Sequence, residues 1–390
     1  MSLSGAGRLS ARIDPEHRAP STEQTMEHFT GTRPVADSHA FDVAALQGFL
    51  ERELTGFEGP LTVEQFKGGQ SNPTYKLLTP GRAYVMRSKP GPAAKLLASA
   101  HAIDREFRVM KSLAGSEVPV PLMHLLCTDE SVIGRAFFVM EFMDGRVLWD
   151  QALPGMANEQ RAAHYDEMNR VIAALHKADV AAAGLSDYGK PGNYFDRQIG
   201  RWSKQYLASN EGSVLEPIAE MDRLIEWLPA RIPASARDAS QVSVVHGDYR
   251  LDNLVFHRDE PRIVAVLDWE LSTLGHPLAD FSYHCMAWHI PPGTFRGIGG
   301  LDHAALGIPS EQAYVERYCE RTGRKDIAAL RADWNFYLAY NLFRLASITQ
   351  GIARRVVDGT AASAQARATG SATRPLAEMA WKFAAAADSH

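Results

Sequence analysis

Two apolar runs near the middle of the chain each end in a loop that carries carboxylate or amide side chains. The first run leads into His-Gly-Asp-Tyr-Arg-Leu-Asp-Asn at residues 246–253, and the second leads into Asp-Trp-Glu at 268–270. Short apolar runs bounded by polar residues predict β-strands. The chain therefore has to fold so that strands deliver Asp248, Asn253 and Asp268 into polar loops.

The spacing of these three side chains indicates a particular chemistry. Asn253 follows Asp248 by five positions and Asp268 ends the next hairpin, which is typical of the catalytic and metal-binding loops of kinases. Phosphoryl transfer needs Mg²⁺ at the phosphate oxygens and a carboxylate that orients the attacking hydroxyl. Because Mg²⁺ prefers oxygen ligands, we predict Asn253 and Asp268 as metal ligands. Asp248 is left to accept the substrate proton as the catalytic residue.

Turn capping is the competing explanation for these residues. Asp and Asn often hydrogen-bond to the backbone in turns, so any one of Asp248, Asp252 and Asn253 could cap a loop. Their joint spacing favours the catalytic interpretation, whereas Asp252 by itself is expected to be a turn residue. We expect His246 to fix the loop backbone by hydrogen bonding rather than to act as a base.

The upstream part of the chain supplies a phosphate-binding loop, a cation and an acid that holds the cation, all of which a kinase needs. Arg87 on the third predicted strand is expected to contact phosphate, and Glu106 on the next helix is expected to position it. Because side chains alternate between the two faces of a strand, Lys89 lies on the same face as Arg87 and is an alternative phosphate contact. A glycine-containing segment can present backbone N–H groups to phosphate, although Gly-Gly is also an ordinary hairpin turn. Its candidate nucleotide-binding residues are Gly68, Gly69, Gln70, Ser71 and Asn72.

Short strands followed by longer helices predict an α+β chain with two lobes. Residues 1–38 are polar, without an apolar period, and are expected to form a disordered tail. Residues 39–143 predict a small nucleotide-binding lobe with an antiparallel sheet of about five strands. Glu141 and Met143, at its end, are expected to line the adenine site, and a plain buried strand is the alternative. Residues 144–390 predict a larger, helical, catalytic and substrate-binding lobe, with the ligand in the cleft between the lobes.

Composition excludes several classes of partner. The chain has 390 residues and a formal net charge of −5, with no run of five or more Lys or Arg. Neither nucleic acid nor an anionic membrane surface is therefore an expected partner. The chain has no apolar stretch of about eighteen residues and no apolar leader, and its three separated cysteines indicate neither a disulfide framework nor a zinc site. We expect a cytoplasmic protein whose partner is a small molecule.

These motifs resemble those of the aminoglycoside phosphotransferase-like family, also called the phosphotransferase enzyme family. The resemblance rests on residues 246–253, on 268–270 and on Leu-Gly-His-Pro-Leu-Ala-Asp at 274–280. It implies a two-lobed protein-kinase-like fold, ATP and Mg²⁺ as cofactors, and phosphate transfer to a hydroxyl of a small molecule. It also implies a structural role for Asp280.

A finer resemblance is to the kinase-like domain that is fused to some acyl-CoA dehydrogenases and to its stand-alone bacterial relatives. It rests on Gly-Gln-Ser-Asn-Pro-Thr at 69–74, on Tyr-Val-Met-Arg at 84–87, and on residues 272–277, 343–346 and 351–355. This subgroup implies a hydroxyacyl-CoA as the phosphate acceptor. The wider family has a lysine at the position of Arg87, so the phosphate contact predicted for Arg87 does not follow directly from the family pattern.

Charge gives a separate argument about the acceptor. Residues 281–390 carry three more positive than negative charges, which would attract an anionic CoA ester and repel a polycationic aminoglycoside. Arg344, Arg354 and Arg355 are candidate substrate contacts, with a solvated helix face as the alternative. A kinase for aminoglycosides, choline or homoserine stays an alternative, as does a pseudokinase that binds nucleotide without turnover. The oligomeric state is left open.

Overall fold

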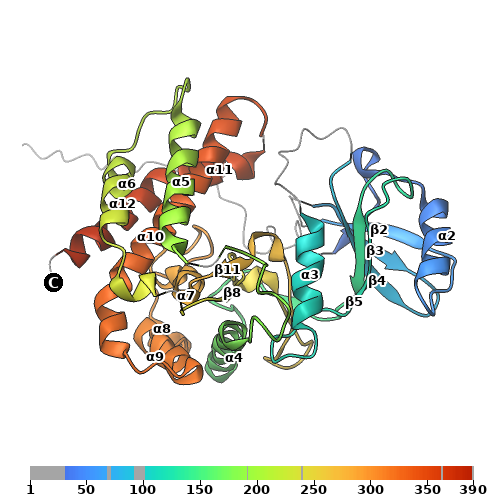
Figure 1. Ribbon diagram of the computed structural model, residues 1–390, viewed down its shortest axis with the longest axis horizontal. Coiled ribbons are helices and arrows are strands. Elements are labelled where there is room, and N and C mark those ends of the chain that lie inside the picture. The colour runs from blue at the N-terminus through green and yellow to red at the C-terminus, as the bar shows by residue number, and fades with distance from the viewer. Residues whose placement is uncertain are drawn as a thin grey trace, which may run out of the picture.

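An antiparallel sheet forms the core of the smaller lobe (Figure 1). The computed structural model describes residues 31–67, 72–91, 102–190, 192–238, 240–361 and 363–388. Within these ranges the sheet has six strands in the order β1-β2-β3-β4-β6-β5. The elements of this lobe are β1 (Thr32–Arg33), α2 (Val43–Glu53), β2 (Thr62–Phe66), β3 (Thr74–Leu78), β4 (Ala83–Ser88), α3 (Ile103–Leu113), β5 (Met123–Cys127) and β6 (Phe137–Glu141).

Side chains of β4 alternate between the two faces of the sheet, as the pleat of a strand requires. Tyr84 and Met86 belong to the apolar cluster that includes α2, whereas Val85 belongs to the cluster that includes α3. α2 covers the outer face of the sheet, and α3 covers the face toward the larger lobe (Figure 1). Arg87 follows Val85 by two positions and therefore faces α3 and the larger lobe.

The prediction of a tail up to residue 38 was wrong for its last residues. Thr32 pairs with Phe66 and Arg33 pairs with Gln65, so β1 extends the sheet at its edge. The Gln65 side chain also accepts a hydrogen bond from the backbone N–H of Ala36 at 3.2 Å. A two-residue edge strand is too short to show an apolar period, which is why the sequence pattern did not indicate it.

The larger lobe is mainly helical, as predicted. Its two small sheets pair β7 and β10 with β9, and β8 with β11. These strands are β7 (Arg146–Val147), β8 (Ser243–Val245), β9 (Leu254–Phe256), β10 (Ile263–Val266) and β11 (Thr273–Gly275). The helices are α4 (Asn158–Lys177), α5 (Tyr194–Asn210), α6 (Ala219–Ala230), α7 (Pro277–Cys285), α8 (His303–Leu306), α9 (Glu311–Thr322), α10 (Ile327–Val357), α11 (Ala364–Ser371) and α12 (Thr373–Ala387). The predicted α+β, two-lobed architecture is confirmed.

α10 is the central helix of the larger lobe, and α5, α7, α11 and α12 pack against it (Figure 1). α7 joins this helical core to the strands that carry the polar loops. Its Phe281 is fully buried and stacks on Tyr318 of α9, with ring centroids 3.8 Å apart. α7 therefore packs against α10 and also contacts α9 through this pair of rings.

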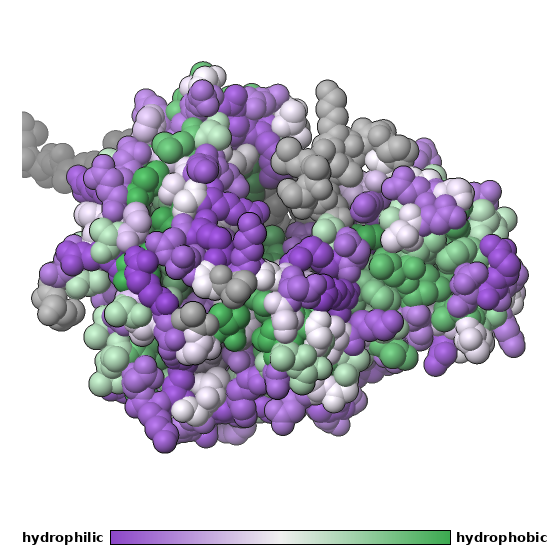
Figure 2. Space-filling view, in the orientation of Figure 1, coloured by the Kyte–Doolittle hydropathy of each residue, from purple (hydrophilic) through white to green (hydrophobic). Residues whose placement is uncertain are grey.

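The surface of the larger lobe is mostly hydrophilic in the view of Figure 2, whereas apolar residues gather over the smaller lobe. Within the described ranges, none of the helices combines the length and the apolar character that crossing a membrane requires.

We expect Phe281→Ala to lower the free energy of unfolding by about 3–5 kcal/mol, because it removes a buried ring and leaves a cavity. Urea unfolding measures this change. The matched control is Val214→Ala at a position that is 82% exposed, where a change within about 0.5 kcal/mol is expected. Equal urea midpoints for the two variants would contradict the packing role of Phe281.

Candidate active site

The loop between β8 and β9 is held by a buried carboxylate on α7. The backbone N–H groups of His246 and Gly247 donate to Asp280 at 2.7 and 2.8 Å. Gly247 has a φ of +82°, and a Cβ at this position would lie 2.7 Å from the carbonyl oxygen of Leu271. Both the left-handed backbone and the close approach require glycine here. Asp280 therefore has the structural role that the family resemblance implied.

His246 joins the two polar loops rather than facing a substrate. Its Nδ1 accepts a hydrogen bond from the backbone N–H of Asp248 at 3.2 Å, so its Nε2 carries the proton that is donated to the carbonyl oxygen of Leu267 at 2.9 Å. The ring is fully buried. The expected backbone-fixing role of His246 agrees with these contacts.

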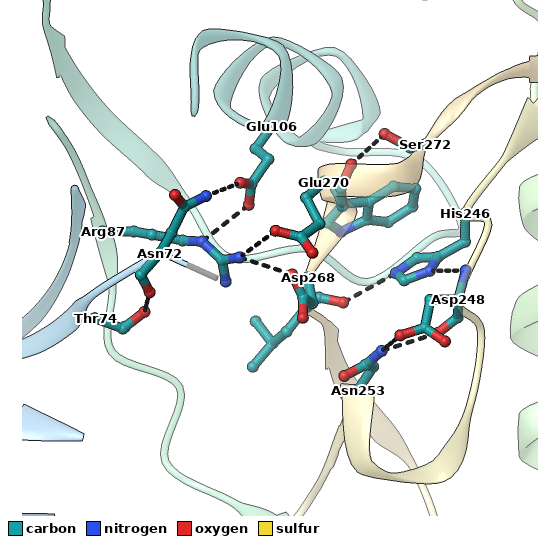
Figure 3. Close-up of polar contacts among 12 residues, drawn as sticks. Asn72, Thr74, Arg87, Glu106, His246, Asp248, Asn253, Asp268, Glu270 and Ser272 are labelled. Carbon is teal, nitrogen blue, oxygen red and sulfur yellow. Dashed lines mark hydrogen bonds and ion pairs between the residues drawn. The ribbon is translucent and has the colours of Figure 1, made fainter. Parts of the chain in front are cut away.

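Three side chains orient the carboxylate of Asp248. Tyr283 on α7 donates its hydroxyl to Oδ1 at 2.6 Å, and Asn253 donates its Nδ2 to Oδ2 at 3.1 Å. The Nε of Arg250 lies 3.3 Å from Oδ2. In Figure 3 the amide nitrogen of Asn253 points to Asp248 and its oxygen points away. The carboxylate is fixed in orientation, while 18% of the side chain stays exposed.

Arg87 links the two lobes through carboxylates on both sides (Figure 3). Its Nε lies 3.2 Å from Glu106 on α3, and its NH2 lies 2.7 Å from Asp268 and 3.5 Å from Glu270, which follow β10. Asn72 donates to the other oxygen of Glu106 at 3.1 Å. Arg87 is thus the basic residue that the structure places against Glu106, as the sequence predicted.

This cluster carries more negative than positive charge. Three carboxylates surround one guanidinium, and Glu106 is only 1% exposed. Burial raises the pKa of Glu106 to about 7; Arg87 opposes this shift, while the charges of Asp268 and Glu270 add to it. Asp268 itself adopts a φ of +65°, a conformation that is uncommon outside glycine and concentrates at functional sites.

The donor set of this cluster fits Mg²⁺. Asp268 and Glu270 offer carboxylate oxygens, and the surplus negative charge of the cluster favours a cation. The amide oxygen of Asn253 stays a predicted further ligand. Among the described residues no group of three or more His, Cys, Asp or Glu side chains could by itself hold a metal. Mg²⁺ is commonly held by one or two carboxylates, with water and phosphate oxygens completing its shell. This small donor set therefore suits Mg²⁺ bound together with a nucleotide.

The other predicted nucleotide contacts have different outcomes. Gly68, Gly69, Gln70 and Ser71 lie outside the described residues. Asn72 is fully buried, and its side chain donates a hydrogen bond to Glu106. Glu141 ends β6, and Met143 follows it where the chain passes into the larger lobe. The adenine contacts of Glu141 and Met143 stay a prediction.

The guanidinium groups of Arg344 and Arg354, two of the three predicted substrate contacts, contact other parts of the larger lobe, and their substrate contacts stay predictions. Arg344 is 6% exposed, donates to the carbonyl oxygen of Gly247, and lies over the Tyr283 ring at 4.9 Å. Arg354 pairs with Asp358 at 2.8 Å and donates to the carbonyl oxygen of Glu211 at 2.7 Å. Arg355 is exposed in the last turn of α10, and its substrate contact stays a prediction.

Sequence reasoning missed Arg250 and Tyr283 as residues that orient Asp248. Tyr283 lies three positions after Asp280 on α7, and residues at this spacing share a helix face. That periodicity was the available signal. Asp252, expected to be a turn residue, instead pairs with Arg296 at 2.8 Å and lies 3.3 Å from Arg250.

Comparisons with known proteins show which family and which proteins this chain resembles. Residues 62–331 match the Phosphotransferase enzyme family. Acyl-CoA dehydrogenase family member 10 of Mus musculus is 44% identical over 356 residues, which are 90% of this chain and 32% of the mouse protein. The chain spans between 32% and 44% of the length of the acyl-CoA dehydrogenase relatives that it matches.

Two solved structures show the same fold. A Ralstonia eutropha JMP134 protein, described as a candidate aminoglycoside phosphotransferase, is 61% identical with a TM-score of 0.80, over 88% of this chain and 98% of that one. A thermostable mutant of an aminoglycoside phosphotransferase, in ternary complex with AMP-PNP and hygromycin B, is 15% identical with a TM-score of 0.55. That similarity covers 87% of this chain and 98% of the other. The predicted protein-kinase-like fold is confirmed.

The pKa of Glu106 gives a testable pH dependence of stability. Its pKa is raised from an ordinary value of 4.5 to about 7, so its contribution is fully present below the lower value and is lost as the pH rises through the higher one. In the absence of Mg²⁺ we expect Glu106→Gln, which cannot ionise, to lose less stability than the wild type between about pH 5 and pH 8. Across that pH range, the free energy of unfolding measured with urea should fall by up to about 3 kcal/mol more in the wild type than in Glu106→Gln.

The control for this series is Glu320→Gln, because Glu320 is exposed on α9 and forms an ion pair with Arg317 at the surface. Its stability should follow that of the wild type at every pH. Identical pH profiles for Glu106→Gln and the wild type would show that Glu106 does not titrate in this range.

Proposed function

The chain belongs to the phosphotransferase enzyme family, and from that premise we propose that it transfers the γ-phosphoryl group of ATP to a hydroxyl of a small molecule with Mg²⁺ bound. The observation that carries the proposal is the arrangement of two fixed carboxylates. Asp248 is oriented by hydrogen bonds from Tyr283 and Asn253 and by an ion pair with Arg250, and it stays partly exposed, while Asp268 is held by Arg87 at the junction of the lobes. The carboxylate of Asp248 can accept a proton from the acceptor, while the carboxylate of Asp268 can bind the metal ion at the phosphates.

The phosphate side is built from Arg87 and the oxygen ligands around it. Mg²⁺ between Asp268 and Asn253 would supply the neutralisation of phosphate charge that phosphoryl transfer requires. Glu106 keeps Arg87 extended from β4 toward the larger lobe, where the guanidinium meets Asp268. The AMP-PNP complex of the aminoglycoside phosphotransferase supports ATP as the donor.

The acceptor side is built around Asp248. A hydroxyl that hydrogen-bonds to its carboxylate would have its oxygen directed toward the γ-phosphorus. It would give up its proton to Asp248 as the new O–P bond forms and the bond from the γ-phosphorus to the β–γ bridging oxygen breaks, with ADP as the leaving group. Tyr283 and Asn253 hold this carboxylate so that it does not rotate during the transfer. The intact Asp248, Asn253 and Asp268 disfavour a pseudokinase.

We propose a hydroxyacyl-CoA as the acceptor. Relatives named as acyl-CoA dehydrogenases support a thioester substrate. The charges near Asp248 support an anionic rather than a cationic acceptor, because both acidic side chains of this loop are engaged by arginines. An aminoglycoside or choline would instead need unpaired acids. A kinase acting on these cations or on homoserine stays the alternative.

We expect Asp248→Ala to lower turnover by about 10²- to 10⁴-fold, because the acceptor hydroxyl loses its base, with AMP-PNP affinity nearly unchanged. The assay is mass spectrometry of phosphate incorporation with Mg-ATP and a mixed panel of 3- and 4-hydroxyacyl-CoAs, aminoglycosides, choline and homoserine. Calorimetric titration measures AMP-PNP binding to the same samples.

Asp259→Ala is the matched control, since Asp259 is an exposed residue of the β9–β10 hairpin and its loss should leave turnover unchanged. Asp248→Asn keeps the size of the side chain and tests whether a loss of activity comes from misfolding. Undiminished turnover in both Asp248 variants would overturn the proposed mechanism.

A further inference from the structure

Charged side chains of alternating sign lead away from Asp248 along the catalytic loop. Arg250 lies between two carboxylates, with its Nε 3.3 Å from Asp248 and 3.3 Å from Asp252. Asp252 in turn pairs with NH1 of Arg296 at 2.8 Å. The ion pairs of Arg87 involve none of these residues, so the two groups of charges share no ion pair.

Arg296 reaches this group from a loop whose backbone is tightly constrained. Phe295 and Arg296 both have positive φ, at 43° and 59°, which non-glycine residues adopt only at an energetic cost. The next residue, Gly297, packs so closely that a Cβ would lie 1.8 Å from the carbonyl oxygen of Ile290. The guanidinium also lies 4.8 Å from the centroid of the Trp149 ring, which follows β7. The loop thus fixes Arg296 between Asp252 and Trp149.

Exposure differs between the acids and the bases of this group. The side chain of Asp252 is 6% exposed, whereas those of Arg250 and Arg296 are 36% and 29% exposed. The Nε of Arg250 is itself buried, so the exposed part of that side chain lies elsewhere than at Nε. The carboxylate of Asp252 is therefore covered while the two arginines stay accessible beside Asp248.

We propose that Arg250 and Arg296 form the site for an anionic group of the phosphate acceptor, a phosphate or a carboxylate, with Arg296 as the main determinant of specificity. This inference rests on the proposed function, because it places the anion on a molecule whose hydroxyl reaches Asp248. Guanidinium groups bind carboxylate and phosphate through paired N–H donors. Asp252 holds both arginines in place, and the Trp149 ring supports Arg296.

The test measures binding rather than turnover, so that it does not depend on catalysis. Calorimetric titration in the presence of AMP-PNP and Mg²⁺ compares the wild type with Arg296→Ala, Arg296→Lys and Arg262→Ala. Arg262 is the control, because it is exposed on the β9–β10 hairpin and pairs with Glu260. The probes are 3-hydroxybutyryl-CoA, 3-hydroxybutyrate, choline and an aminoglycoside. Of the two anionic probes, 3-hydroxybutyryl-CoA carries phosphates and a thioester, and 3-hydroxybutyrate carries a carboxylate.

The expected result is that at least one anionic probe binds to the wild type and binds about 10- to 100-fold more weakly to Arg296→Ala, as for the loss of a charge-assisted hydrogen bond. Arg296→Lys should bind the anionic probe with intermediate affinity. Arg262→Ala should bind it as tightly as the wild type does, and the affinity for AMP-PNP should be the same in all variants. Binding of the CoA ester alone would assign the anion to its phosphates, and binding of the free acid would assign it to the carboxylate.

Three results would overturn the inference: no binding of either anionic probe to the wild type, preferential binding of a cationic probe, or an affinity for Arg296→Ala within about two-fold of the wild type. A wild type that binds an anionic probe in an Arg296-dependent manner without phosphorylating it would leave this inference standing. In that case the proposed hydroxyacyl-CoA acceptor would fail.

Discussion

The contact between Arg87 and three carboxylates sets how the two lobes meet. The guanidinium comes from β4 in the smaller lobe, and it contacts Glu106 beside it and Asp268 across the cleft. Arg87 and Glu106 are buried, and removing one partner of a buried ion pair commonly costs about 3–5 kcal/mol. The contact also leaves a surplus of negative charge where a nucleotide and its metal would bind. The same interaction therefore aligns the lobes and prepares the site.

The rest of the site follows from elements that are packed for structural reasons. Aromatic stacking of Phe281 on Tyr318 fixes α7, and α7 carries both Asp280 and Tyr283. Asp280 then holds the loop backbone, while Tyr283 orients Asp248. Arg344 on α10 supports the same loop through Gly247. Residues far apart in the sequence thus converge on one carboxylate.

The spacing of nearby residues in the sequence predicted the features that are local in the chain. The five-residue separation of Asp248 and Asn253 and the strand before Asp268 are local patterns, and the period of two in β4 predicted the face of Arg87. Tyr283 and Arg250 were missed because their contacts with Asp248 depend on tertiary packing. Arg344, Arg354 and Arg355 were predicted as substrate contacts from a charge count, which does not show that the side chain of Arg344 is buried. The short strand β1 lacked any apolar period.

The Mg²⁺ dependence of ATP binding, measured by calorimetric titration of the wild type and of Asp268→Asn, tests most directly whether the Arg87 cluster binds the metal and the nucleotide. The carboxylate surplus around Arg87 predicts that Mg²⁺ strengthens ATP binding to the wild type and that this gain is largely lost in Asp268→Asn. Binding of ATP to the wild type that is equally tight with and without Mg²⁺ would contradict the assignment of this cluster as the metal-nucleotide site.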